Sequence, residues 1–216
     1  MIFKKEEPWL LWPEVNAYGI DKGSIGSLFN GENDFTLSFN LDLIDIEADK
    51  KTLFSILPFY IGFDVEGFSL SFILTTTDED GNKVPEYFWF NNVIKKTENI
   101  FTITYSKDDK KINILLDDVL LMEKILTNTN FNNISKSHII FGAGNFPNNN
   151  YNLNYAEYEP KNLIFCKKCL SYDDIINIFN DEKMNEDIIA YFNFKKYTDH
   201  KIYDLTGNCN FLNKII

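Results

Sequence analysis

Two stretches in the first third of the chain alternate apolar and polar residues with a period of two. From Phe35 to Leu43 the odd positions are all Phe or Leu, and the even positions are Thr, Ser, Asn and Asp. A second stretch ends at Leu74, and its inward positions are predicted to be Phe68, Leu70, Phe72 and Leu74. Successive side chains of a strand point to opposite faces, so this pattern predicts strands with one face in a core.

Strand-length segments continue along the chain at spacings typical of hairpins. We expect a turn at Asp78–Asn82, in which Gly81 supplies a positive φ. With no repeat, linker or break in composition, the pattern of about a dozen strands predicts an all-β, two-sheet antiparallel jelly-roll β-sandwich. We expect one domain over residues 1–216, either alone or as a module of a longer protein. The other predicted strands are Pro8–Val15 (an edge strand between prolines), Leu53–Phe63 (broken at Pro58), Tyr87–Asn91 (a central strand), Phe101–Tyr105, Ile112–Leu121 (two strands meeting at Asp117-Asp118) and His138–Gly144.

The last quarter of the chain predicts the only long helix, between two strands. Ser171 is a good N-cap, and Asp173 and Asp174 would lie at the positive end of the helix dipole. The predicted elements are a strand at Lys161–Phe165, a helix at Tyr172–Asn180 with an apolar stripe of Ile175, Ile176 and Phe179, a strand at Asp187–Asn193, and a polar turn at Asp204–Asn208.

This ending resembles that of laminin-G-like domains of the concanavalin-A-like lectin/glucanase superfamily. In those domains a Leu-Ser pair precedes a short acidic helix, and an aromatic strand leads to an Asp-x-(Ser/Thr)-Gly-Asn turn. Leu170-Ser171, Tyr191–Phe194 and Asp204–Asn208 match these parts. Asp118 departs from the family, which has Gly at that hairpin turn, so we expect a conformational cost there. The order of the final elements also resembles the lectin-like half of the clostridial neurotoxin receptor-binding region.

The charge of the chain excludes some classes of partner. The net charge is −11, and all 21 basic residues are Lys. Nucleic-acid binding needs clustered cations and favours Arg, so no nucleic-acid partner is expected. No segment has the ~20 apolar residues of a membrane span. Met1–Glu7 is unlike a signal peptide, so we expect a cytoplasmic protein, export by a non-Sec route or an excised domain. Cys166 and Cys169 are interpreted as reduced thiols.

The aromatic strand supplies a candidate sugar-binding face. Tyr87, Trp89 and Asn91 share one face of this strand, and Phe88 and Phe90 lie on the other, which we expect to face the core. Aromatic rings stack on the apolar faces of sugars, while amides and carboxylates bind sugar hydroxyls. The resemblance implies that such a platform lies on the concave sheet. The alternative is that Tyr87 and Trp89 only flank the core or line a subunit contact. The residues that could complete the platform are Tyr60, Asp64, Asn113, Tyr151 and Tyr155.

The sequence gives weaker signals for catalysis and for metal binding than for sugar binding. Asp45, Glu47 and Asp49 alternate as glycosidase acids do, but in a different residue order, so we predict no catalytic residue. Asp78, Asp80, Asp204 and Asn208 are suitable Ca²⁺ ligands in type, yet their spacing indicates capping turns, and no cofactor is expected. The sequence predicts a non-catalytic carbohydrate-binding or adhesive module. The alternatives are an assembly module of a phage or cell-surface structure, including a homo-oligomer, and then a glycoside hydrolase.

Overall fold

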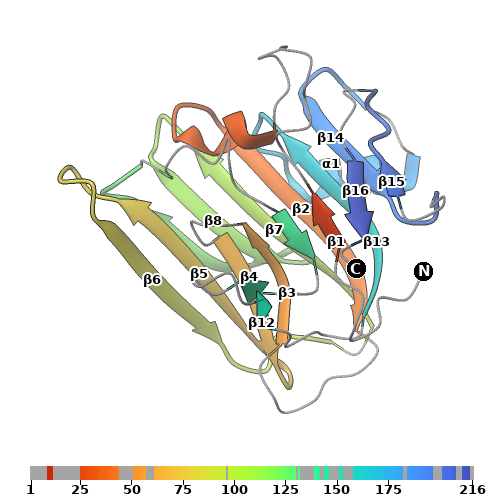
Figure 1. Ribbon diagram of the computed structural model, residues 1–216, viewed down its shortest axis with the longest axis horizontal. Helices are drawn as coiled ribbons and strands as arrows, with labels where there is room; N and C mark the ends of the chain where they lie inside the picture. The colour runs from red at the N-terminus through yellow and green to blue at the C-terminus, as the bar shows by residue number, and fades with distance from the viewer. Residues whose placement is uncertain are drawn as a thin grey trace.

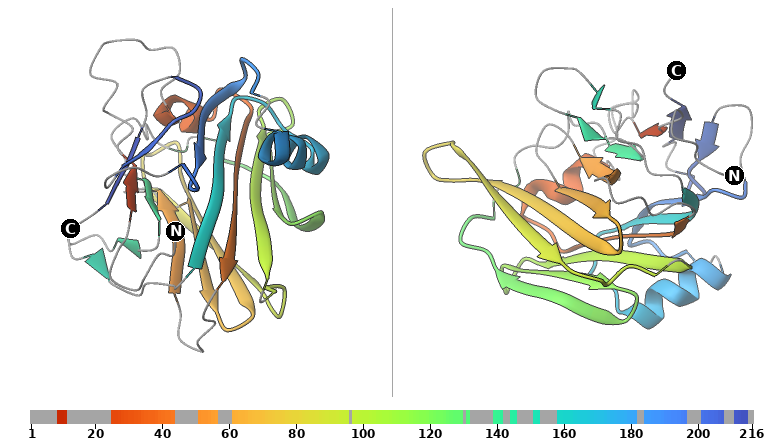
Figure 2. Two further views of the ribbon diagram at one scale, coloured as in Figure 1. Left: turned by 90° about the vertical axis from the view of Figure 1, so that its right-hand side faces the viewer. Right: turned by 90° about the horizontal axis from the view of Figure 1, so that it is seen from below.

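Two antiparallel sheets pack face to face, and one helix covers the outer side of one of them (Figures 1 and 2). This computed structural model describes residues 9–11, 25–43, 51–56, 61–95, 97–129, 131, 139–141, 144–145, 151–152, 158–181, 184–196, 201–207 and 211–214. The all-β sandwich predicted from the alternation is therefore confirmed. Within those ranges, no helix has both the length and the apolar character needed to cross a bilayer.

The larger sheet has eight strands and contains both ends of the described chain. Across it the order is β15 (Lys201–Tyr203), β16 (Phe211–Lys214), β1 (Trp9–Leu11), β10 (Ile139–Phe141), β3 (Lys51–Ile56), β4 (Ile61–Glu66), β5 (Ser69–Thr77) and β6 (Lys83–Phe90).

The smaller sheet has six strands. Its order is β14 (Ile188–Asn193), β13 (Tyr158–Cys166), β2 (Phe35–Leu43), β7 (Glu98–Ser106), β8 (Lys111–Leu116) and β9 (Val119–Ile125). A separate pair, β11 (Gly144–Asn145) and β12 (Tyr151–Asn152), and a 3₁₀ helix, η2 (Ile25–Asn30), complete the described elements.

Phenylalanine rings fill the space between the two sheets. Phe39 and Phe101 of the six-stranded sheet stack with ring centroids 5.0 Å apart, and Phe39 also contacts Phe63 of the other sheet at 5.7 Å. Phe63 in turn packs on Phe72 at 5.2 Å. Such aromatic pairs stabilise a core beyond their area burial. Most residues predicted to face the core are buried, among them Phe39, Leu41, Leu70, Phe72, Phe101, Ile103, Ile114, Phe192 and Phe194.

The helix α1 (Tyr172–Asp181) begins at the predicted cap. The backbone N–H of Asp174 donates to Ser171 Oγ at 3.2 Å, and Asp174 Oδ2 accepts from the Ser171 N–H at 3.0 Å. This reciprocal pair satisfies two amides that the first turn leaves without intrahelical partners. The predicted stripe is partly wrong, because Ile175 and Ile178 are buried whereas Ile176 is only half-buried.

The helix packs on the outer face of the six-stranded sheet, away from the phenylalanine core (Figure 2). Ile178 and Phe179 form a second apolar cluster there with Ile164 of β13 and Tyr191 of β14. The loop leading into the helix also covers this face. Thr36 Oγ1 accepts from the Leu170 N–H at 2.9 Å and donates to the Lys168 carbonyl at 2.6 Å, so this outward-facing hydroxyl is buried.

Two strand positions differ from the predictions. The strand containing Tyr87 and Trp89 was expected to be central, but β6 forms an edge of the eight-stranded sheet. The strand at Trp9–Leu11 was expected at an edge, but β1 pairs with β10 on one side and β16 on the other. Strand order depends on pairing between distant segments, and the composition of a strand does not determine it.

Two turn residues also differ from the sequence predictions. Phe68 was expected to point inward, but it lies in the tight turn between β4 and β5 and is 42% exposed. The strained residue of the β8–β9 turn is Asp117, with φ 55°, rather than Asp118. Asp tolerates this left-handed conformation better than most residues. Here its Oδ1 accepts from the Ile100 N–H at 2.9 Å, which holds the conformation in place.

Candidate functional site

Four of the eight predicted platform residues lie on or beside the outer face of β4, β5 and β6. These three strands run side by side at one end of the eight-stranded sheet (Figure 1). Asp64 on β4 pairs with Ser71 on β5, and Ser71 pairs with Trp89 on β6. Residues directly opposite each other in a ladder point to the same face. The register therefore aligns a carboxylate, a hydroxyl and an indole in one row.

Two aromatic side chains of the edge strand β6 are exposed on this face. Tyr87 is 72% exposed and Trp89 is 46% exposed. Phe88 and Phe90, between and beyond them, pack against the core as expected. The indole Nε1–H of Trp89 donates to Asn91 Oδ1 at 2.6 Å, which fixes the two side chains next to each other. An exposed aromatic pair with an adjacent amide is suited to stacking on a sugar ring.

The core-facing side of β6 is closed by a charged pair. Lys124 of β9 forms an ion pair with Glu86 of β6, and its ammonium lies 5.3 Å from the centroid of the Phe88 ring. The ion pair joins the two sheets at their edge strands. Inward-pointing charges at an edge also oppose pairing with other chains. The backbone beneath Tyr87 and Trp89 is thus held from the inner side, while the aromatic face stays exposed.

Buried polar groups lie beside the aromatic pair. Asp64 is 7% exposed, Ser71 6% and Thr75 4%. Within the described part of the chain, neither Ser71 Oγ nor Thr75 Oγ1 has a hydrogen-bond partner. Burying an unpaired hydroxyl has a cost, so each such group calls for an explanation, and a buried water would supply one. Glu66, two residues after Asp64 on β4, points to the same side and is exposed.

Sequence reasoning did not single out Ser71, Thr75 or Glu66. The signal for Ser71 was present, because it lies between the inward residues Leu70 and Phe72 and must therefore point outward. What the sequence could not show was that β5 lies between β4 and β6. Without that order, Ser71 could not be placed between Asp64 and Trp89.

The remaining predicted site residues do not join this group. Asn113 lies on β8 in the other sheet, where its Nδ2 donates to Thr104 Oγ1 at 3.3 Å on the outer face of the sandwich opposite Trp89. Tyr60 and Tyr155 lie outside the described residues. Tyr151 belongs to β12, but its side chain is not among those described. The described platform is therefore Asp64, Tyr87, Trp89 and Asn91.

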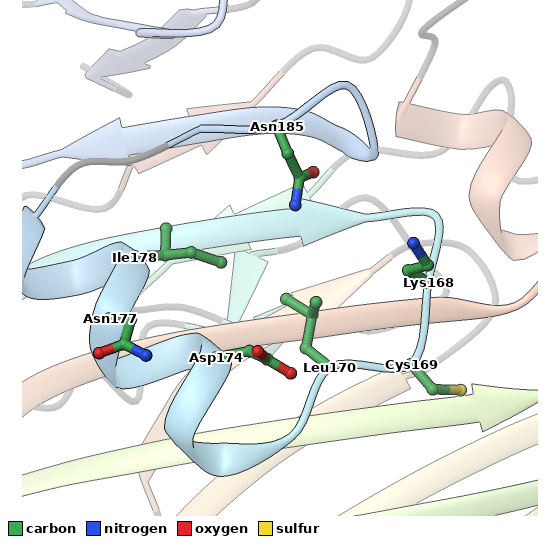
Figure 3. A pocket seen from close by; sticks show the side chains of 7 residues that line it. All are labelled: Lys168, Cys169, Leu170, Asp174, Asn177, Ile178 and Asn185. Atoms are coloured by element: carbon green, nitrogen blue, oxygen red, sulfur yellow. The ribbon is translucent and has the colours of Figure 1, made fainter.

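A pocket of about 460 Å³ lies between α1 and the turn before β14 (Figure 3). Its charged groups already have internal roles. The Lys168 ammonium binds Asp187 at 2.8 Å, and the Asp174 carboxylate caps the helix. None of its lining side chains is aromatic, so it offers a sugar ring no stacking surface. We therefore place the candidate site on β4–β6. The pocket is lined by Lys168, Cys169, Leu170, Asp174, Asn177, Ile178 and Asn185.

The side chains considered as metal ligands and the two thiols have structural roles in the fold. Asp204 Oδ1 accepts from the Tyr191 and Thr206 N–H groups, each at 2.9 Å. The pKa of Asp78 is lowered, mainly because the Asn82 N–H donates a hydrogen bond to its carboxylate. Burial raises the pKa of both Cys166 and Cys169 to about 11, which keeps these thiols protonated and unreactive near neutral pH. The described ranges contain no cluster of three metal-binding side chains. Asn208, Cys209 and Asp45–Asp49 lie outside them.

Comparisons by sequence find no match: no protein-family model matches the chain, and no curated protein does either. Similar folds occur among solved structures. A Bacteroides ovatus protein to which carbohydrate binding has been ascribed is 10% identical, with a TM-score of 0.63 over 98% of this chain. The present chain spans only 58% of that protein.

Two further solved structures share the fold. The CBM40 module of the Ruminococcus gnavus IT-sialidase, solved with α2,3-sialyllactose, is 13% identical, with a TM-score of 0.53 over 68% of this chain and 83% of its own. A structure of botulinum neurotoxin type C is 16% identical, with a TM-score of 0.50 over 70% of this chain and 37% of its own. At these identities the likeness establishes a lectin-like β-sandwich fold and no more.

Proposed function

We propose that this chain is a non-catalytic carbohydrate-binding module whose binding face is the outer side of β4–β6. The observation that carries the proposal is the exposed pair Tyr87 and Trp89 on a face that also holds Asp64 and Ser71. In soluble proteins, exposed aromatic side chains grouped with convergent polar groups are typical of binding sites. The carbohydrate-binding structures with the same fold support the same class of ligand.

Each side chain has a defined part in this proposal. The Trp89 indole stacks on the apolar face of a pyranose ring, and Tyr87 extends the stacking surface along β6. The amide of Asn91, beside the indole, binds ring hydroxyls. Ser71 and Asp64 are buried beside this surface and contribute to its support. We further propose that the chain is a single domain over residues 1–216, of the laminin-G-like branch of the concanavalin-A-like sandwiches.

A glycan array probed with the full chain, followed by calorimetry on the best-binding glycan, tests this function. The wild-type chain should bind at least one glycan with micromolar affinity, and Tyr87→Ala should weaken that binding by about tenfold, the effect of losing one stacking contact. Tyr203→Ala is the matched control, because Tyr203 is also an exposed tyrosine of the eight-stranded sheet, at 54%, but lies on β15 at its far end. Absence of binding to every glycan on the array would refute the proposal.

An assembly module is the second candidate, and the edge strand β9 supports it. Val119, Leu120 and Ile125 of β9 are 55%, 51% and 71% exposed. Exposed apolar side chains on an unpaired edge are suited to contact with another chain. Sedimentation analysis separates the two functions. A stable oligomer that Ile125→Lys dissociates, with no glycan binding, would favour assembly.

A glycoside hydrolase is the third candidate. Asp64 and Glu66 alternate on β4, so strand geometry places them about 7 Å apart on one face, near the ~6.5–9.5 Å separation of inverting glycosidases. Asp64 is buried, which disfavours direct attack on a glycosidic bond, so binding is the preferred function. Release of reducing ends from a bound glycan, abolished in Glu66→Gln, would support hydrolysis instead.

A further inference from the structure

We infer that the glycan bound at this face is a linear chain that lies along β6 and is held through internal sugars, rather than through a single terminal sugar. The inference rests on the proposed function and names its ligand class. It follows from three ring-bearing side chains, Pro85, Tyr87 and Trp89, at alternate positions of one strand. All three are exposed, whereas Glu86 and Phe88 between them point inward and are half-buried.

The spacing of the three rings matches successive units of a chain. Alternate residues of a strand are about 7 Å apart, so Pro85 and Trp89 are separated by about 13 Å. A pyranose is a six-membered ring of similar width to the aromatic ring on which it stacks, so one sugar covers one of these side chains. A ligand that contacts all three rings must therefore be extended, run along β6 and present about three sugars.

The row of rings is open along the strand and at both of its ends. The residues opposite it on β5 are Thr75, Ile73 and Ser71, which are buried or half-buried, so the rings form most of the exposed surface on this side. Lys83 and Asn91 lie just beyond the two ends of the row and are exposed, so a chain lying on the rings can continue past both. Enclosed ligands are held in concave sites, whereas an open row contacts one side of a longer chain.

Pro85 also argues against a protein strand as the occupant of this surface. The strand β6 lies at the edge of its sheet (Figure 1), and an open edge can pair with another chain. Proline has no N–H to donate to a further strand, and it is one of the residues that protect sheet edges. The inward ion pair of Glu86 with Lys124 acts in the same direction. The exposed rings therefore suit a ligand that needs no backbone pairing, such as a glycan.

An array of linear oligosaccharide ladders tests the inference. It carries cello-, xylo-, manno- and chito-oligosaccharides of one to about six sugars, beside branched glycans that end in single terminal determinants. Binding of the full chain to at least one ladder should rise about three- to tenfold for each sugar up to the third, the effect of one stacking contact, and less than about twofold beyond it. Calorimetry with a soluble polymer of the same sugar should show several protein chains per polymer, because internal sugars repeat along it.

Pro85→Ala separates the outermost contact from the other two. It should lower the affinity for the three-sugar member by about threefold, to that of the two-sugar member, and change the shorter members by less than about twofold. Ile125→Ala is the matched control, since Ile125 is also an exposed apolar residue of an edge strand, but on β9 of the other sheet. It should leave every ladder unchanged. The wild-type ladder profile and stoichiometry decide the inference even if Pro85→Ala alters the strand.

Two kinds of result would overturn the inference and leave the proposed function standing. One is binding to a single sugar as tight as binding to three. The other is binding confined to the terminal determinants, with one protein chain on each end of a glycan. If no glycan of any kind binds, the proposed function fails and the inference fails with it.

Discussion

The indole N–H of Trp89 donates a hydrogen bond to the Asn91 side-chain oxygen at 2.6 Å, across the end of the edge strand β6. Asn91 is the first residue of the turn that follows β6, so the hydrogen bond links the strand to this turn. The bond selects one orientation of an indole ring that is nearly half exposed. Ordering the ring before a ligand arrives removes part of the entropic cost of binding.

Asn91→Ala should therefore weaken glycan binding by about five- to tenfold, roughly the value of one hydrogen bond to a neutral partner. It should also increase the mobility of the Trp89 indole in the free protein, measured by ¹⁵N relaxation of the indole N–H. Asn91→Asp keeps the acceptor oxygen and should restore an ordered indole. An indole equally ordered in wild type and Asn91→Ala would show that Asn91 does not position it.

Trp89→Ala should abolish glycan binding while the melting temperature stays within about 4 °C of wild type, because the ring contributes little to the core. Calorimetric titration and thermal unfolding on the same preparation measure both effects. A large fall in melting temperature would mean that Trp89 is needed for folding. The binding surface would then have to be sought elsewhere, first in the Asn-rich segment 145–154.

Phe72→Ala should lower the free energy of unfolding by about 3–5 kcal/mol, because it leaves a cavity between the sheets. Phe72 is fully buried and packs on Phe63 at 5.2 Å and on Phe88 at 6.1 Å. Urea unfolding followed by fluorescence gives the value. A loss below about 1 kcal/mol would contradict the assigned faces of β5.

Ser171→Ala should destabilise the protein by about 1 kcal/mol through loss of the helix cap. The Ser171 side chain is also the main cause of the lowered pKa of Asp174. A carboxyl with a lowered folded pKa stabilises the fold above its unfolded pKa, and that stability is lost as the pH falls through the folded pKa. Below about pH 4 the two proteins should therefore become more alike in stability. Urea unfolding at a series of pH values checks this convergence, and a pH-independent difference would contradict it.

The parts of this fold that could be predicted are those that short-range patterns determine. The alternation from Phe35 to Leu43 matches β2 residue for residue, and the Ser171 cap lies within three residues of its partner. Asp117-Asp118 marks the β8–β9 turn because polar residues interrupt two apolar runs there. In each case the determining interactions span only a few residues.

The parts that could not be predicted depend on pairing between distant segments. Asn113 was predicted to complete the platform around Trp89, yet β8 belongs to the other sheet. Asp64 joins Trp89 only through the register of two successive ladders, in which Ser71 is the shared partner. The covering of Thr36 by the loop at Lys168–Leu170 spans more than 130 residues of sequence. No local pattern encodes such contacts.

Because inward and outward side chains alternate along β6, the ligand specificity of such a module can be changed without altering its core. Phe88 and Phe90 carry the contribution of this strand to the core, while Tyr87 and Trp89 face outward and Asn91 is exposed in the turn that follows. Core-packing positions and ligand-facing positions therefore alternate along the strand, and no position serves both purposes. A combinatorial library at Pro85, Tyr87, Trp89 and Asn91 would vary the ligand surface while leaving the packed side unchanged. Selection or engineering could thereby exchange one specificity for another on a constant scaffold.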